Sequence, residues 1–351
     1  MYRDRFTWLA GLVLGAMLAA PIMWEARAQT PAEPWPDMLV NPQAAPDDMV
    51  LPGPCGTRMA FRKVITRTES NWLSDRRFKL GRPTQYQPYD EYRRFGFVAG
   101  SFSGEGGPGA RHYYIGKYEV TRGQYAAVMD ETCPKATEEA SLPVEDAAWF
   151  DAVAFAQRYT LYLYRNHPES LPREDGNLGF LRLPTEPEWS YAARGGHAVT
   201  PQELNQDLFP MDGPIEDYAW LAGGQSCNGY SQYVGTTRRP NPLGLYDVLG
   251  NVQEIIHETY RMSAPGRMHG QSGGFIARGG SCASSASQIS TATRVEANYF
   301  DPVNAEVRRP PFTGLRLVIS APVTTSPKRS TQLSEDWSRA RAMRTPEDTG
   351  N

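Results

Sequence analysis

The residues with the clearest potential for chemistry lie in one stretch, residues 241–254, which reads NPLGLYDVLGNVQE. Asp247, the backbone at Gly250 and Val252, and Glu254 place oxygen atoms at every second or third residue. A loop that wraps around a calcium ion needs hard oxygen ligands at such a spacing. The sequence therefore predicts a calcium site formed by these four residues. The alternative is a loop that is held by backbone hydrogen bonds alone.

The rest of the chain offers no recognisable catalytic constellation. It contains no Gly-x-Ser-x-Gly elbow, no phosphate-binding glycine loop and no paired-histidine metal signature, and its five histidines are scattered. Glu254, Glu258 and Glu296 are carboxylates that could act as general acid or base, although charged residues on loops are usually solvated. Glu188 is a weaker candidate of the same kind. The catalytic residues, if any, are therefore unassigned.

The four cysteines, Cys55, Cys133, Cys227 and Cys282, are candidates for disulfides. None of them belongs to a Cys-x-x-Cys pair, so a zinc site or a thioredoxin-like motif has no support. An even number of cysteines in an exported protein predicts disulfides, and four cysteines allow three connectivities. We expect Cys227 to pair with Cys282, because both lie in the loop-rich half of the chain. Cys55 would then pair with Cys133.

Export is predicted from the first 28 residues. Arg3 and Arg5 form a basic start, residues 8–22 are an apolar run, and residues 26–28 read Ala-Arg-Ala, a small-residue cleavage pattern. The apolar run is shorter than the roughly 20 residues that a spanning helix needs, so an uncleaved anchor is the less favoured reading. We therefore expect a cleavable signal peptide over residues 1–28, a mature N-terminus at Gln29 and a periplasmic or secreted protein.

Composition narrows the classes of partner. The chain of 351 residues has 36 Lys and Arg against 39 Asp and Glu, a net charge of −3, so it lacks the basic excess expected of a nucleic-acid-binding protein. We expect a protein or peptide partner, with no nucleic acid and no stable membrane span after signal cleavage.

The elements that must position these residues follow from the residue patterns. Residues 29–51 are rich in Pro, Ala and Asp and predict an extended leader that buries no core, with structure starting near Cys55. Residues 59–65, 77–81, 97–102 and 113–120 have the short, apolar and β-branched character of strands.

Helices follow these strands. Thr121 caps a short helix, and apolar residues at spacings of three and four over residues 148–165 predict the longest helix. Thr185 and Glu188 form a capping box for a further helix that buries Trp189 and stops at Gly195.

Beyond Gly195 the pattern indicates mostly loop, with short strands at residues 275–278 and 314–319. Residues 52–320 are therefore interpreted as one α+β domain. Residues 321–351 are interpreted as a polar C-terminal tail, in which residues 332–343 form a helix around Trp337.

Several blocks resemble the formylglycine-generating enzyme family, also called sulfatase-modifying factors. The stretch at residues 241–254 is similar to the family pattern NxxGLYDxxGNVWEW. Other family-like blocks occur in the same order as in the family, namely YIGKYEVT (residues 114–121), WFDAVAF (149–155), LRLPTEPEWSYAARGG (181–196), RGGS (278–281) and GLRL (314–317). The resemblance implies the formylglycine-generating-enzyme fold, with a C-type-lectin-like appearance and little regular secondary structure. The calcium loop at Asp247, Gly250, Val252 and Glu254 also fits the family pattern.

The resemblance implies a specific chemistry whose ligands this chain lacks. Active members of the family oxidise a peptide cysteine to formylglycine with copper(I), which is held by two cysteines that follow the Arg-Gly-Gly-Ser block. Here those positions hold Ser284 and Ile289, and a one-residue shift gives Ser285 and Ser290. Copper(I) prefers soft thiolate ligands, so no copper site is expected. The Trp-Glu-Trp of the family is also changed, to Gln253-Glu254-Ile255.

Two classes of function are consistent with this pattern. One is an exported binding or regulatory module that has kept the fold and lost the metal. Residues 179–185 resemble the corresponding block of exported relatives that regulate a signalling kinase in type VI secretion clusters. The other class is a non-classical oxidoreductase on the same scaffold, of the formylglycine-generating type or like the relatives implicated in siderophore maturation.

Overall fold

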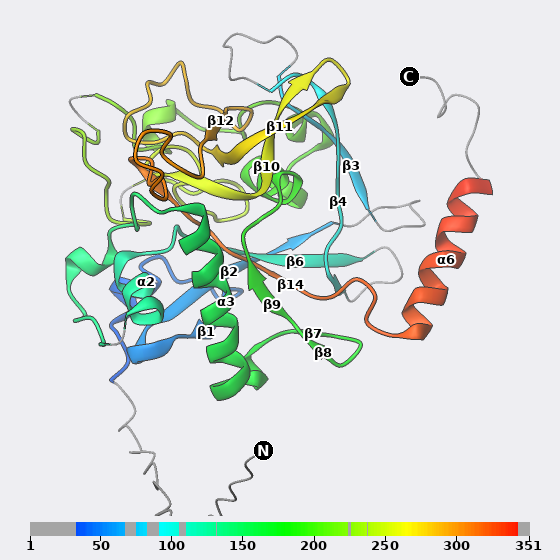
Figure 1. Ribbon diagram of the computed structural model, residues 1–351, viewed down its shortest axis with the longest axis horizontal. Coiled ribbons are helices and arrows are strands. Elements are labelled where there is room, and N and C mark those ends of the chain that lie inside the picture. The colour runs from blue at the N-terminus through cyan, green and yellow to red at the C-terminus, as the bar shows by residue number, and fades with distance from the viewer. Residues whose placement is uncertain are drawn as a thin grey trace, which may run out of the picture. The chain divides into compact units, whose positions relative to one another are not determined.

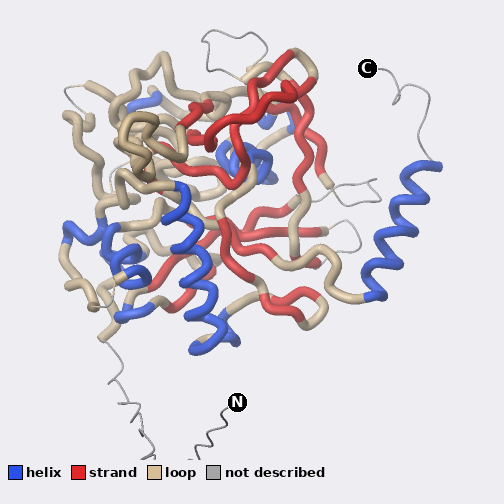
Figure 2. The backbone as a smooth tube through the Cα atoms, viewed as in Figure 1, coloured by secondary structure: helices blue, strands red, loops and turns tan. Residues whose placement is uncertain are grey.

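The computed structural model describes residues 33–66, 75–82, 91–104, 110–130, 132–223, 226–236 and 238–342. The predicted signal peptide lies outside these residues. The described part contains two main sheets with helices packed beside them, and much of the chain between the strands is loop (Figure 1; Figure 2). The α+β fold class predicted from the sequence is confirmed.

The larger sheet has six strands among the described residues, and all its pairs are antiparallel. Its order is β1-β2-β6-β14-β9, and β5 also pairs with β6. The strands are β1 (Met49–Pro52), β2 (Arg58–Ile65), β5 (Phe102–Ser103), β6 (Arg111–Gly116), β9 (Phe180–Arg182) and β14 (Val318–Ser320).

The second sheet has the order β12-β11-β10-β13. Two small antiparallel ribbons, β3 with β4 and β7 with β8, complete the described strands. The strands are β3 (Arg76–Leu80), β4 (Arg94–Val98), β7 (Arg173–Glu174), β8 (Asn177–Leu178), β10 (Gln253–Ala264), β11 (Arg267–Arg278), β12 (Arg294–Ala297) and β13 (Thr313–Gly314).

The three helices predicted between residues 121 and 195 form as α2, α3 and α4, whereas the short helices α1 and α5 were not predicted. Thr121 and Thr185 each cap a helix with a complete capping box, which satisfies amide groups that a helix start otherwise leaves unpaired. The predicted inner face of α3 is buried and packs beside β9 (Figure 1). The helices are α1 (Asp37–Val40), α2 (Arg122–Met129), α3 (Trp149–Asn166), α4 (Glu186–Ala193), α5 (Pro201–Leu204) and α6 (Pro327–Ala342), with short 3-10 turns at Pro54–Gly56, Glu138–Ser141, Pro168–Ser170, Gly196–Ala198 and Ile215–Asp217.

Both predicted disulfides are present. Cys55 is bonded to Cys133, and Cys227 is bonded to Cys282, with Cα–Cα distances of 5.4 Å in each case. The Cys55–Cys133 bond ties the turn before β2 to the segment after α2. The Cys227–Cys282 bond joins two stretches of the loop-rich half.

The prediction that residues 29–51 form a leader that buries no core is wrong for the described part. Trp35, Val40 and Leu51 are buried, and β1 forms an edge of the six-stranded sheet. The Trp35 ring lies against Gly123 of α2, where a larger residue would collide with it. The composition is rich in Pro and Asp, but three large apolar side chains are enough to anchor the segment. The domain therefore begins before Cys55.

The strand predictions need four further corrections. The strand expected at residues 113–120 ends at Gly116, the last residue of β6. The strand expected at residues 97–102 is divided, because β4 ends at Val98 and β5 begins at Phe102. The strand expected at residues 314–319 is also divided, into β13 and β14, which belong to different sheets. The stretch after Gly195 was expected to be mostly loop with short strands, but β10 and β11 form a hairpin of two 12-residue strands.

The C-terminal segment contains the predicted helix, although α6 starts five residues earlier than expected, at Pro327. Trp337 in α6 is half exposed. Among the described residues, no helix is both long enough and apolar enough to cross a membrane.

The packing of the N-terminal segment can be tested with Trp35→Ala. We expect this change to lower the free energy of unfolding by about 3 kcal/mol, because it removes a buried indole and leaves a cavity beside Gly123. Urea unfolding followed by circular dichroism measures the effect. Met38→Ala is the matched control, since Met38 is 73% exposed and its loss should change stability little. Equal, small effects of the two changes would contradict this account of the segment.

Candidate functional site

The stretch at residues 241–254 is a buried turn that leads into β10. The Asn241 amide donates to the carbonyls of Ala192 and Ala193 at the end of α4, at 2.8 and 3.1 Å, and its oxygen accepts from the Leu243 and Leu245 amides. One side chain thus fixes the turn on the C-terminus of α4. The prediction of a loop to the end of the stretch needs one correction, because Gln253 and Glu254 already belong to β10.

Glu254 lies in a buried ion pair. Both of its carboxylate oxygens accept from the Arg316 guanidinium, at 2.6 to 3.0 Å, and the Trp189 indole N–H donates to it at 2.7 Å. Arg316 is fully buried and also donates to the carbonyls of Gly116 and Tyr246. Glu254 therefore joins α4, β10 and the segment between β13 and β14. It is not a solvated acid or base.

Asp247 is buried in the middle of the same stretch, and its backbone is in the left-handed region of φ/ψ space, with a φ of 57°. Its Oδ2 accepts from the Gly235 amide at 2.9 Å, while its Oδ1 is buried without a hydrogen-bond partner. Burial raises the pKa of Asp247 to about 6, and the nearby charge of Glu254 adds to this. A buried carboxylate oxygen with no partner is costly, so a proton or a cation at this position would be stabilising.

Glu119, which follows β6, is a member of this cluster that was not singled out as a site residue. Its carboxylate accepts from the Asn251 side-chain amide at 2.6 Å and from the Val252 amide at 3.1 Å. Burial raises the pKa of Glu119 well above its usual range, and Asp247 and Glu254 raise it further. Glu119 belongs to the family-like block at residues 114–121, and this block could have indicated it as a site residue. The sequence did not show its contact with Asn251, because 132 residues separate the two.

The cluster has more carboxylates than cationic groups. If all three carboxylates were ionised, Glu119, Asp247 and Glu254 would face the fully buried guanidinium of Arg316 and, near Asp247, the partly buried Arg238. Buried charges need partners, so the excess must be neutralised by protons or by a cation. We call Glu119, Asp247, Glu254 and Arg316 the acidic cluster.

The predicted calcium ligands fit an ion only in part. The Asp247 Oδ1 atom is a buried oxygen that is ready for a ligand, whereas the Glu254 oxygens are taken by Arg316 and Trp189. The amides of Gly250 and Val252 are hydrogen-bonded, and their carbonyls are the atoms that the prediction assigns to the ion. Within the described ranges, no three side chains of His, Cys, Asp or Glu converge as a metal site. An ion here would depend on Asp247 and backbone oxygens.

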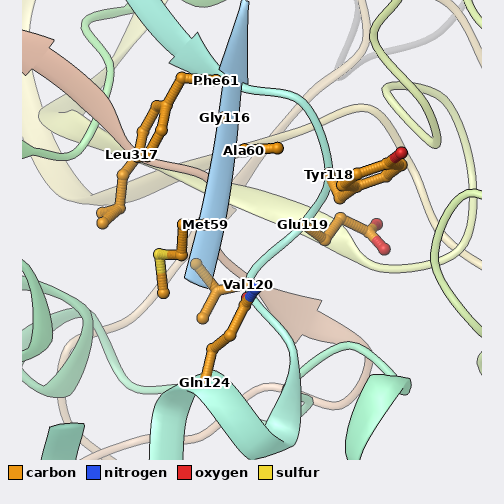
Figure 3. A pocket seen from close by; sticks show the side chains of 9 residues that line it. All are labelled: Met59, Ala60, Phe61, Gly116, Tyr118, Glu119, Val120, Gln124 and Leu317. Atoms are coloured by element: carbon orange, nitrogen blue, oxygen red, sulfur yellow. The ribbon is translucent and has the colours of Figure 1, made fainter. Parts of the chain in front are cut away.

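A small pocket lies beside Glu119, between β2 and α2 (Figure 3). Figure 3 shows Tyr118 and Glu119 projecting from the same segment, with the Glu119 carboxylate directed away from Met59 and Gln124. The pocket has a volume of about 10 Å³. This is room for about one water molecule, so the pocket is too small for an organic substrate.

The positions at which the family resemblance places copper cysteines have other roles. Ile289 is buried in the core, and its side chain lies next to Gly280. The Ser284 hydroxyl accepts from the Ser281 amide at 3.1 Å and stabilises a turn. Cys282 is bonded to Cys227, and none of the chain's cysteines is free. The donor set therefore does not fit copper(I), which requires soft thiolates.

The shifted alternative offers no thiolate either. The Ser285 hydroxyl bonds to Gln288, and the Ser290 hydroxyl accepts from the Ala292 and Thr293 amides. Both side chains serve local turns.

The remaining acid–base candidates have structural roles. Glu258 accepts from the Glu186 amide at 2.9 to 3.0 Å at the start of α4, and burial raises the pKa of Glu258 to about 7, with Glu186 contributing. Glu296 accepts from the Gly274 amide at 2.8 Å. Glu188 forms a two-pronged ion pair with Arg182, with both distances 2.7 Å. These carboxylates therefore do not converge on one reacting centre.

Sequence comparison places these features in a known context. A family model described as sulfatase-modifying factor enzyme 1-like domain matches residues 108–321. The chain is 31% identical over 176 residues to a protein named chaperone protein LppX of Paenibacillus barcinonensis, covering 40% of this chain and 60% of that protein.

Two further relatives carry names from the formylglycine-generating group. The chain is 31% identical over 133 residues to a formylglycine-generating enzyme of Thermomonospora curvata, covering 34% of each. It is 31% identical over 135 residues to inactive C-alpha-formylglycine-generating enzyme 2 of Mus musculus, covering 35% of this chain and 34% of that one. The chain thus spans less than two thirds of the length of each of these three relatives.

Two solved structures share the fold. Variable protein 1 of Treponema denticola has a TM-score of 0.51 and 22% identity, and PvdO of Pseudomonas aeruginosa has a TM-score of 0.51 and 18% identity. Each match covers 79% of this chain and all of the other. At such low identity the likeness concerns the fold alone.

The raised pKa of Asp247 predicts a pH dependence of stability. The folded protein holds this proton up to about pH 6, whereas the unfolded chain loses it near pH 4, so the free energy of unfolding should fall as pH rises between these values. Asp247→Asn should remove about 2 kcal/mol of this fall between pH 4.5 and 7. Urea unfolding in the presence of a chelator at both pH values measures it. The exposed Asp212→Asn is the control and should keep the wild-type slope; identical slopes for all three proteins would show that Asp247 does not cause the pH dependence.

Proposed function

The chain belongs to the sulfatase-modifying factor family, and from that premise we propose that it is an exported binding module of the family. In this proposal it binds a protein partner and does not perform the copper-dependent oxidation of cysteine to formylglycine. The observation that carries the proposal is the pair Ser284 and Ile289 at the two ligand positions. A hydroxyl and an alkyl side chain cannot replace the thiolates that copper(I) prefers.

The surroundings of these positions support the same conclusion. Ile289 packs in the core, and Cys282, the nearest cysteine in sequence, is bonded to Cys227. All four cysteines are in disulfides, so a cysteine could become a copper ligand at this position only if a disulfide broke and Ile289 left the core. By contrast, the structural elements of the family pattern are kept, including the capped α4 and the buried pair of Glu254 with Arg316. Loss of ligands with retention of the scaffold is consistent with binding, because one fold supports several functions.

Export is part of the proposal. Two disulfides in one domain are typical of proteins in oxidising compartments, where thiols are not kept reduced. The basic and apolar start of the chain agrees with this and predicts a cleavable signal peptide. We place the mature protein in the periplasm or outside the cell.

The relatives support a protein partner. One is named a chaperone protein, and another is named an inactive formylglycine-generating enzyme. Residues 179–185 add a narrower hypothesis, namely regulation of a signalling kinase linked to type VI secretion. Co-purification with the products of neighbouring genes would test that link.

The absence of formylglycine chemistry is testable with the mature protein. We expect no conversion when the protein is supplied with copper, oxygen and a Cys-x-Pro-x-Arg peptide, because it has no thiolate pair to hold copper(I). Mass spectrometry of the peptide measures the product. An active formylglycine-generating enzyme under the same conditions is the positive control. Conversion by this protein would overturn the proposal.

We also propose that a calcium ion binds at the acidic cluster. Its excess negative charge and the unpaired Asp247 Oδ1 suit a hard divalent cation, which prefers oxygen ligands. Asp247 and the backbone at Gly250 and Val252 would hold the ion. Glu254, which is bound to Arg316, would contribute mainly through its charge. The role of the ion would be to stabilise the turn, not to react.

Calcium removal is expected to lower the melting temperature. An ion that binds only the folded protein stabilises it by about 2.7 kcal/mol at a hundredfold excess over Kd. Asp247→Ala should abolish the difference between calcium and chelator, because it removes the oxygen with no other partner. Asp212→Ala, a change of an exposed carboxylate, should leave the response intact. Superimposable melting curves of the wild type with calcium and with chelator would instead favour a loop held by hydrogen bonds.

A further inference from the structure

An apolar cleft lies between α3 and β9, and no residue of the acidic cluster lines it. Its volume is about 230 Å³, and its exposed surface is almost wholly apolar, with Val153 and Leu161 of α3 and Phe180 and Leu183 at β9 among the lining residues, although Gln157, Thr160, Arg182 and His257 also line it. Leu161 is 40% exposed. Exposed apolar surface that is both concave and continuous is typical of interaction sites.

Aromatic side chains extend this surface beyond the N-terminal end of α3. Trp149 and Phe150 contact Tyr299, with ring centroids 5.5 and 5.6 Å apart, and Phe150 contacts Phe300 at 5.5 Å. Phe150 is 40% exposed and Phe300 is 52% exposed. These four rings form a wall that is only partly covered by the rest of the chain.

His257 connects the cleft with the aromatic wall. Its side chain lines the cleft, and its ring centroid lies 6.4 Å from that of Trp149. The cleft and the four rings are therefore neighbours along α3, from Trp149 and Phe150 at its start to Leu161, and we call them together the α3 groove. It runs from Phe300 at one end to Phe180 at the other.

The charged groups at the α3 groove are neutralised. Arg182 is paired with Glu188 at 2.7 Å, and Asp151 is paired with Arg309 at 2.5 Å. Burial lowers the pKa of His257, and Arg182 lowers it further, so this ring is neutral at pH 7. The groove thus offers apolar contact without a net charge. A partner with exposed charges would have to lose hydration without gaining an ion pair.

The charge pairing at the α3 groove also favours a polypeptide partner over an anionic membrane. Anionic membranes attract surfaces that carry unpaired Lys and Arg, which the groove-lining residues do not supply. An elongated groove matches an extended polypeptide, which can place successive side chains along it. Strand addition to β9 is not the mode, because the Leu181 amide already donates to the Thr160 hydroxyl at 2.9 Å. Binding would instead be through side chains.

We propose that the α3 groove binds an extended, uncharged polypeptide segment rich in Leu, Val and Phe. The inference rests on the proposed function, because it identifies the surface and the partner chemistry of the binding module. The large apolar side chains of the segment fill the cleft and stack on the aromatic wall. Its backbone remains partly solvated.

Fluorescence anisotropy with a fluorescein-labelled peptide of alternating Leu, Val, Phe and Ser residues tests this proposal. We expect saturable binding by the mature protein, and none of a matched peptide in which Asp replaces the apolar residues. Phe300→Ser and Leu161→Asp should each raise Kd roughly tenfold, because each removes an apolar contact at one end or the middle of the groove. The matched control is Phe97→Ser, since Phe97 on β4 is 54% exposed and lies outside the groove. It should leave Kd unchanged.

Several outcomes would overturn the inference. These are an absence of binding by the apolar peptide, an equal loss in Phe97→Ser, or full binding by Phe300→Ser and Leu161→Asp together. A dimer that Phe300→Ser dissociates in light scattering would assign the groove to a second copy. Binding to phosphatidylglycerol vesicles that Phe300→Ser abolishes would assign it to a membrane.

The two proposals fail separately. If the protein converts the cysteine peptide to formylglycine, the proposed function fails, whatever the anisotropy shows. If there is neither conversion nor binding of the apolar peptide, only the assignment of the groove fails. Melting temperatures of all variants near that of the wild type would establish that Kd reports the surface and not unfolding.

Discussion

Buried ion pairs centred on α4 hold together a domain that has few long strands or helices. Glu186 bonds to Arg278 and Arg294, with distances of 2.7 Å to each, and Trp189 on the same helix donates to Glu254. These arginines come from β11 and β12, more than 90 residues further along the chain. A buried charge that lost its partner would be strongly destabilising, so the segments around α4 can adopt only arrangements that keep these contacts. The eight-residue helix is thereby fixed to the sheet that contains β10, β11 and β12.

The acidic cluster is a consequence of the same arrangement. Arg316 satisfies Glu254 and two backbone carbonyls, but it cannot also neutralise Glu119 and Asp247. With all three carboxylates ionised, the turn where β10 begins would therefore carry surplus negative charge. Protonation and cation binding are the two physical solutions. Protonation makes stability fall as pH rises and gives no response to calcium, whereas cation binding strengthens as pH rises and makes stability depend on calcium.

The scaffold and the chemistry of this family are separable because they depend on different residues. The scaffold depends on caps, on buried pairs and on the Asn241 turn, all of which are present. The oxidation chemistry depends on two thiolates, and Ile289 in the core shows that one of those positions now contributes to packing. The α3 groove lies on another part of the surface, lined by α3 and β9, and its contacts do not require those positions. A protein can therefore lose the reaction and keep, or acquire, a binding surface.

The sequence determined those features that depend on local patterns. It predicted the helix cap at Thr121, the capping box at Thr185, the buried face of α3 and the family fold, because capping and helical periodicity involve residues a few positions apart. It also determined that thiolates are absent from the copper positions. The pairing of Cys227 with Cys282 was predicted correctly, although the sequence alone allowed three connectivities.

Only the tertiary structure decided which distant groups meet. Three contacts join residues that are far apart in the chain. Trp35 packs against Gly123, Asn251 donates a hydrogen bond to Glu119, and Glu254 forms an ion pair with Arg316. The spacing from Asp247 to Glu254 suggested four equivalent oxygen ligands, but a spacing does not show which oxygens are already bonded. Only the folded chain shows which polar atoms are buried and which partners they have. These two properties decide whether an oxygen is available as a ligand or is already hydrogen-bonded.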